Sequence, residues 1–197
     1  MFLFEEDGNN LLLRSSGLKM DLRGALDAGL LDIQQIDPAE MAPGEFMRVV
    51  VDAEAAGERV IVIDSLNDYL NAMPEERFLI THMHELLTYL GQRGVVTMLV
   101  GVQPGIMGTN MSTAVDISYS ADSVIMLRFF ETRGKVRQAI SVLKKRVGKH
   151  ERTIRLFGMS HEKGIYVGDV LANFHGILTG IPTLGEVAVF DFGDGDQ

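Results

Sequence analysis

Three carboxylates directly follow apolar segments of the chain, a position that suits metal-assisted chemistry. Asp64 ends the segment 59–64, in which four consecutive β-branched residues predict a buried strand. A carboxylate at the end of such a strand can hold Mg²⁺ directly or through water. Because many strands also end in an Asp that only caps the following turn, the position by itself does not decide between the two roles.

Glu5 and Glu6 form the second acidic feature, an adjacent pair that follows the apolar run 1–4. Adjacent residues of an extended chain point in opposite directions, so at most one of the two carboxylates can face a bound ligand. That carboxylate could polarise a water molecule, whereas the other would have a structural role.

Cations gather in residues 128–155, where ten Lys or Arg stand against two Glu in a chain of net charge −9. Lys144 and Arg146 lie two residues apart, on the strand face that Ile140 and Val142 begin. Such a pair suits a phosphate, because Arg offers a fork of donors and Lys a point charge. Nucleic acid, an acidic neighbouring subunit or a lysine-protected sheet edge would explain the charge equally well.

The histidines and serines carry weaker signals. His82 and His84 would lie about 200° apart on a helix, so we do not expect them to share a metal ion. Ser112, Ser118 and Ser120 have no nearby His and Asp in the sequence that would make them nucleophiles.

The elements that must position these side chains alternate between short apolar strands and amphipathic helices. Apolar runs predict strands at 1–4, 30–36, 59–64 and 95–100, a hairpin of 124–130 with 136–143, and short strands at 152–157 and 165–167. Helix starts are predicted at Asp7 or Asn9, at Asp21, at Pro43 and at Pro74. The order predicts an α/β sandwich with a mixed sheet, whose ligands bind beyond the carboxyl ends of the strands. Glu5, Glu6, Asp64, Ser65 and Gln103 fall there.

Composition supports one globular domain, with 46% hydrophobic and 23% charged residues among 197. The absence of cysteine excludes disulfides and thiolate metal sites. The longest uncharged stretch, 94–115, contains Gln103, Pro104 and four glycines, so it is not expected to span a membrane. Since the N-terminus also lacks the layout of a signal peptide, we expect a cytoplasmic protein.

A phosphate-cradling loop is missing from the sequence. The pairs Gly134-Lys135 and Gly148-Lys149 are followed by Val and His, and neither has the upstream glycine that such a loop requires. The chain is therefore not expected to grip a triphosphate in the usual way.

Several ordered segments together resemble the KaiC branch of the RecA-type ATPases, over residues 1–182. The resemblance rests on Phe4-Glu5-Glu6, Arg59-Val-Ile-Val-Ile-Asp-Ser65, Ala121-Asp-Ser-Val-Ile-Met-Leu127, Ala139-Ile-Ser-Val-Leu-Lys-Lys-Arg146, His150-Glu-Arg-Thr-Ile-Arg155 and the closing segment 174–182. It implies a RecA-like three-layer sandwich with a mostly parallel sheet and C-terminal antiparallel strands. Residues 183–197 would form an acidic, Gly-rich tail.

The resemblance also implies a function, because the family is a ring-forming, hexameric ATPase that uses ATP and Mg²⁺ and includes serine/threonine autokinases. Glu5 and Glu6 would be the catalytic glutamates, and Asp64 would be the Walker B carboxylate that binds the metal. Residues reaching the nucleotide of the adjacent subunit would be Lys144, Lys145, Arg146 and His150.

Three departures from the family pattern qualify this interpretation. The family's first strand and P-loop are expected just upstream of Met1, so the chain is predicted to be catalytically incomplete as given. The phosphoacceptor pair falls at Ser118 and Tyr119, where kinase members carry Ser-Thr, which argues against sequential autophosphorylation. Leu18 and Gln138 replace an aromatic residue and an arginine of the clock members, so a circadian role is not predicted.

The leading prediction is thus the nucleotide-hydrolysing part of a KaiC-like homo-oligomeric ATPase. A non-catalytic interaction module of the same fold, in a signalling protein, is the alternative. Nucleic-acid binding, as in recombinase relatives, ranks last, because residues 103–115 lack interleaved aromatic and basic side chains.

Overall fold

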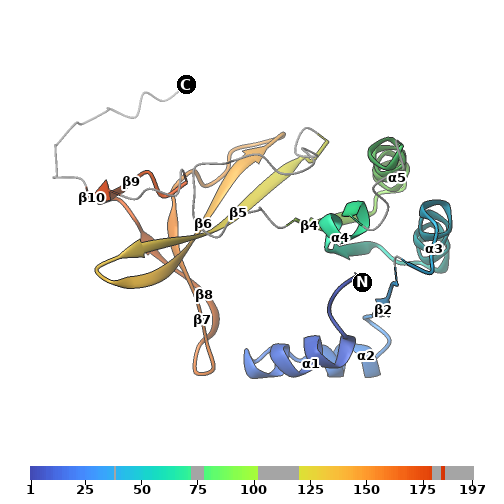
Figure 1. Ribbon diagram of the computed structural model, residues 1–197, viewed down its shortest axis with the longest axis horizontal. Coiled ribbons are helices and arrows are strands. Elements are labelled where there is room, and N and C mark those ends of the chain that lie inside the picture. Colours follow the sequence, from blue (N-terminus) through green and yellow to red (C-terminus); the bar gives the residue numbers. More distant parts are fainter. Residues whose placement is uncertain (38, 72–77, 102–119, 179–182, 185–197) are drawn as a thin grey trace. The chain divides into compact units, whose positions relative to one another are not determined.

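The computed structural model describes residues 1–37, 39–71, 78–101, 120–178 and 183–184 (Figure 1). They form two compact units, one built mainly from residues 1–101 and the other mainly from residues 121–159 and 165–178. None of the described helices is both long and apolar enough to cross a membrane.

A parallel sheet forms the centre of the first unit, with strand order β2-β1-β3-β4. Its strands are β1 (Phe2–Leu3), β2 (Gln34–Gln35), β3 (Val60–Asp64) and β4 (Val96–Val100). Leu3 is in register with Asp64, and Asp64 with Val100, so three strands end at the same edge of the sheet.

Five described helices connect or cover these strands: α1 (Gly8–Gly17), α2 (Leu22–Asp27), α3 (Pro43–Ala56), α4 (Leu66–Asn71) and α5 (Leu79–Gln92). The side chain of Asp7 caps α1 by accepting a 2.7 Å hydrogen bond from the Asn9 backbone N–H. Asp21 caps α2 in the same way at Gly24. Gly57 ends α3 with a φ of 114°, a conformation that favours glycine.

The core of this unit lies between α3, α5 and one face of the sheet; Figure 1 shows the two helices side by side. Ile61 and Ile63 of β3 are buried on that face. An aromatic cluster with ring centroids 5.2–5.9 Å apart extends this core next to β1. It comprises Phe2, Phe4, Phe46 and Tyr69. Apolar burial of this kind supplies the main stabilisation of the unit.

The other face of the sheet carries apolar side chains that remain exposed. Val60 is 54% exposed, and Val96 and Met98 are 58% and 54% exposed. Because Val60 pairs with Val96 and Val62 with Met98, these side chains form one continuous patch, which we call the open valine face. Parallel sheets usually bury both faces, so this exposure is unusual.

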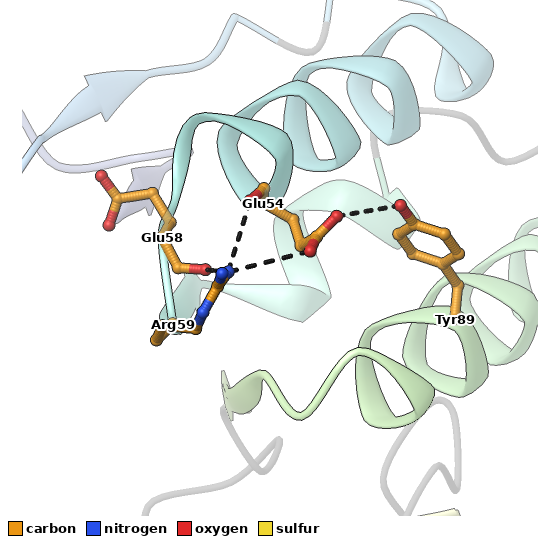
Figure 2. Close-up of polar contacts among 4 residues, drawn as sticks. All are labelled: Glu54, Glu58, Arg59 and Tyr89. Atoms are coloured by element: carbon orange, nitrogen blue, oxygen red, sulfur yellow. Dashed lines mark hydrogen bonds and ion pairs between the residues drawn. The ribbon is translucent and has the colours of Figure 1, made fainter.

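A buried carboxylate joins α3 to α5 at the end of β3 opposite Asp64. Glu54 accepts a 3.0 Å hydrogen bond from the hydroxyl of Tyr89, and the guanidinium of Arg59 lies 3.7 Å from its other oxygen (Figure 2). Arg59 also donates to the backbone carbonyls of Glu54 and Glu58. The network satisfies a carboxylate that would otherwise be costly to bury.

The second unit contains a four-stranded sheet of order β5-β6-β7-β8, in which β5–β6 and β6–β7 are antiparallel. The strands are β5 (Ser123–Thr132), β6 (Lys135–Lys145), β7 (Arg155–Ser160) and β8 (Gly164–Val170). Arg133 and Gly134 form the tight turn of the predicted hairpin, both with positive φ. A small core of Phe130, Ala139 and Ile177 supports the sheet.

The predicted succession of parallel and then antiparallel strands is confirmed, with local corrections. The strand predicted at 30–36 is shorter and consists of β2, next to which the Ile36 backbone N–H also donates a 2.8 Å hydrogen bond to the Leu3 carbonyl. The helix predicted from Pro74 is described from Leu79 onward, since residues 72–77 lie outside the described chain. The short helix α4 was not predicted. Within the expected tail, Thr183–Leu184 forms β10, which pairs with β9 (Phe174–His175).

Candidate functional site

The end of the parallel sheet brings Glu5 and Asp64 to one edge of the first unit. Leu3 pairs with Asp64, and the Phe4 backbone N–H donates a 2.8 Å hydrogen bond to the Asp64 carbonyl. Glu5 therefore leaves the sheet immediately beyond Asp64. This strand pairing brings together two residues that are 59 positions apart in the sequence, Glu5 and Asp64.

A third carboxylate, Asp68 of α4, joins this edge. Its side chain hydrogen-bonds to the carboxyl of Glu5 and accepts a hydrogen bond from the Ser65 hydroxyl. The hydrogen bond to Asp68 raises the pKa of Glu5, and the negative charges of Asp68 and Asp64 add to that rise. The protonated form of Glu5 is therefore favoured beside Asp68.

Asp64 also has a raised pKa, chiefly because the half-buried carboxylate is partly removed from water. The positive charge of Arg14 opposes this rise, and the charge of Asp68 adds to it. The ionised form of Asp64 is therefore poorly compensated by the protein itself. A cation at this position would supply the missing compensation.

Glu6 points to a different partner from Glu5. Its carboxylate forms a 2.7 Å ion pair with Arg14 of α1. The two adjacent glutamates thus have separate contacts, and only Glu5 lies against the Asp64 and Asp68 carboxylates.

Asp68 and Arg14 were not singled out in the sequence. A signal for Asp68 existed, because Ser65-Leu-Asn-Asp68 has the Ser-x-x-Asp spacing that marks a helix start. The Asp68 backbone N–H lies 3.4 Å from the Ser65 hydroxyl, as such a start requires. Arg14 had no comparable signal, since its contact with Glu6 depends on the path of the chain into α1.

The donor set of this edge fits Mg²⁺, which prefers carboxylate oxygens and keeps several waters and phosphate oxygens. Among the described residues, no three His, Cys, Asp or Glu side chains converge as a closed metal cage. A magnesium ion bound together with nucleotide phosphates needs only one or two carboxylates. Asp64, a half-buried carboxylate at the end of β3, is the residue best suited to that role.

The predicted basic residues lie at the end of β6 in the second unit. Lys144 and Lys145 are the last residues of the strand, and Arg146 follows them. Arg146 forms a 3.0 Å ion pair with Asp122, and Lys145 donates a hydrogen bond to the Lys149 carbonyl. Together with His150, these side chains form what we call the basic segment, 144–150.

The remaining candidates are only partly described. The Nδ1 atom of His84 lies 3.2 Å from the Ser120 hydroxyl, a contact across 36 residues that the sequence pattern did not indicate. Gln103, Ser118 and Tyr119 lie outside the described residues.

The fold and the carboxylates at this edge of the sheet identify the fold class of the protein. A parallel sheet with carboxylates at the ends of neighbouring strands, continued by antiparallel strands, is an α/β fold of the RecA type. A solved structure of a KaiC-like protein from the hyperthermophilic archaeon Pyrococcus horikoshii OT3 matches it with a TM-score of 0.70. That match is 22% identical and covers 85% of this chain and 75% of the archaeal one, so it supports the fold.

The family model of the KaiC ATPase matches residues 2–171. The chain therefore belongs to the KaiC family of ATPases. It is 27% identical over 198 residues to the circadian clock protein KaiC3 of Synechocystis, covering 92% of this chain and 36% of that protein. It is also 27% identical over 196 residues to the circadian clock oscillator protein KaiC of Thermostichus vulcanus, covering 93% and 35%. The chain thus spans about a third of the length of these relatives.

Proposed function

We propose that this chain takes part in binding and hydrolysing ATP in a ring of identical subunits, and that it is catalytically incomplete as given. The observation that carries the proposal is the pairing of Leu3 with Asp64, which brings Glu5 and Asp64 to one edge of the sheet. Family membership supports the same reading.

In this proposal Asp64 holds Mg²⁺ and Glu5 faces the water that attacks the terminal phosphate. When bound, the ion neutralises phosphate charge. The raised pKa of Glu5 suits a group that accepts a proton from water. Glu6 acts through Arg14, whose guanidinium holds the segment between β1 and α1 in place.

The basic segment completes the site of a neighbouring subunit. Lys144, Lys145, Arg146 and His150 supply positive charge and donors that suit the phosphates of a nucleotide bound next door. An arginine supplied in this way can stabilise the charge that develops in phosphoryl transfer. We propose hydrolysis rather than autophosphorylation, because Tyr119 stands in place of the threonine of the Ser-Thr phosphoacceptor pair of the kinase members.

Mixed rings test the proposal. The chain is extended at its N-terminus by the P-loop segment of a KaiC relative, and Asp64→Asn subunits are mixed with Arg146→Ala subunits. Each variant alone is expected to be nearly inactive, since an arginine acting in trans is worth about 10³-fold or more in rate. Mixed rings are expected to regain Mg²⁺-dependent ATP hydrolysis. If mixing restores no activity, Arg146 does not act across a subunit interface.

A further inference from the structure

Arg146, whose forked guanidinium is the group of the basic segment best suited to a phosphate, is already engaged by a carboxylate. Its guanidinium Nη1 lies 3.0 Å from the Asp122 carboxylate, and its backbone N–H donates a 2.7 Å hydrogen bond to the Asp122 carbonyl. The two residues are therefore held together by both backbone and side chain. Asp122 was not among the residues expected to act at this site.

The strand pairing explains why these two residues meet. Ser123 is opposite Lys145, so Asp122 and Arg146 extend the β5–β6 ladder by one further pair. A register shift next to Val124 and Ile125 sets this end of the ladder, because Val124 pairs with Lys144 whereas Ile125 pairs with Val142. Irregularities of this kind re-aim the side chains that follow them.

The side-chain contact is exposed and hence readily exchanged. The Arg146 side chain is 56% exposed and that of Asp122 is 77% exposed. Ion pairs in water contribute little to folding, so this pair is not needed to hold the hairpin together. A polyphosphate carries more charge than one carboxylate and can accept two parallel hydrogen bonds from a guanidinium.

We propose that Asp122 is a positioning residue, which holds Arg146 at the strand end until a polyphosphate displaces the carboxylate. The inference rests on the proposed phosphate-binding role of the basic segment. It adds that the Asp122 carboxylate competes with the phosphates for Arg146. Asp122 lowers the affinity of the basic segment for phosphates in the free chain and keeps the guanidinium oriented for capture.

The experiment uses the chain as it is, residues 1–197, with sodium tripolyphosphate as the probe in calorimetric titrations at low salt. Asp122→Asn is expected to tighten binding about two- to fivefold, the range that an exposed ion pair allows. Arg146→Ala is expected to weaken it. In the double variant the gain from Asp122→Asn is expected to disappear, because its cause is competition for Arg146.

Glu131→Gln is the matched control, because it also replaces a carboxylate by its neutral amide. Glu131 is an exposed carboxylate at the opposite end of β5, so this variant removes the same charge without touching Arg146. Its effect measures the general gain in anion affinity. Asp122→Ala is made as a second variant and is expected to follow Asp122→Asn.

The outcomes separate the two proposals. If the wild-type chain binds tripolyphosphate but Asp122→Asn binds no better than Glu131→Gln, the role of Asp122 is overturned and the basic segment stands. The role is also overturned if the gain persists in the Arg146→Ala background. If neither wild type nor Asp122→Asn binds, or if Arg146→Ala binds as wild type does, the proposed phosphate-binding role of Arg146 fails as well.

Discussion

The hydroxyl of Tyr89 donates a 3.0 Å hydrogen bond to the carboxylate of Glu54, a residue of the last turn of α3 that is only 8% exposed. The bond joins the two helices that cover the buried face of the sheet (Figure 2). It lies at the end of β3 opposite Asp64. The contact therefore concerns the stability of the unit rather than its chemistry.

Glu54→Ala and Tyr89→Phe are each expected to lower the free energy of unfolding by about 1–3 kcal/mol, because each leaves the other polar group without this partner. Their effects should add only in part, since both remove the Tyr89–Glu54 hydrogen bond, while Glu54→Ala also removes the ion pair with Arg59. Urea denaturation followed by circular dichroism measures both. Asp52→Ala is the control: Asp52 is exposed on the same helix, 3.9 Å from Arg48, and should cost less than about 0.5 kcal/mol.

Asp68→Asn is expected to raise the thermal midpoint at pH 7.5, because it removes a negative charge from beside Glu5 and Asp64. The raised pKa of Glu5 means that its carboxyl binds a proton more tightly in the folded chain than in the unfolded chain, where the pKa of Glu5 is near 4.5. The free energy of unfolding therefore falls as pH rises from about 4.5 through the raised pKa.

The advantage of Asp68→Asn over wild type should accordingly be largest at neutral pH and should shrink toward pH 4, where Glu5 is protonated. Melting curves at several pH values measure it. Asp169→Asn removes an exposed carboxylate of β8 and serves as the control. An advantage that is equal at pH 4 and pH 7.5 would show that repulsion among these carboxylates is not its cause.

Purified residues 1–197 are expected to show negligible ATP hydrolysis. The reason is that the sequence has no Gly-rich loop whose backbone N–H groups and lysine could hold the β- and γ-phosphates. Phosphate release measured with and without Mg²⁺ tests this. Steady turnover that Glu5→Gln or Glu6→Gln abolishes would mean that the chain holds phosphates by another arrangement.

The open valine face predicts self-association at low micromolar concentration, since a contiguous exposed apolar patch favours contact with another chain. Met98→Lys is expected to reduce the association by placing a charge within the patch. Sedimentation velocity measures it. Leu13→Lys is the control, because Leu13 is an equally apolar and strongly exposed residue of α1. A wild-type chain that sediments as a monomer would contradict the prediction.

Local signals in the sequence identified most of the elements. The Asp7 cap of α1 and the Pro43 start of α3 depend on neighbouring residues only, and both are confirmed. The strand before Asp64 followed from its β-branched residues, but the expected burial holds only for the face of Ile61 and Ile63, because Val60 on the other face is 54% exposed.

The contacts within the site were less predictable, because they depend on register and chain path. Asp68 meets Glu5 only because β1 pairs with β3 at Leu3. Asp122 meets Arg146 only because the β5–β6 ladder shifts by one residue near its end. No local propensity encodes either relationship.

Successive side chains of the five-residue strand β3 point to opposite faces of the sheet, so the strand contributes to the core on one face and carries Asp64 on the other. Ile61 and Ile63 point into the helix-covered core, whereas Val60, Val62 and Asp64 belong to the other face. A protein engineer could therefore repack α3 and α5 to raise thermal tolerance while leaving the surroundings of Asp64 untouched. Changes on the opposite side of the same strand would alter the surroundings of Asp64 without disturbing that repacked interior.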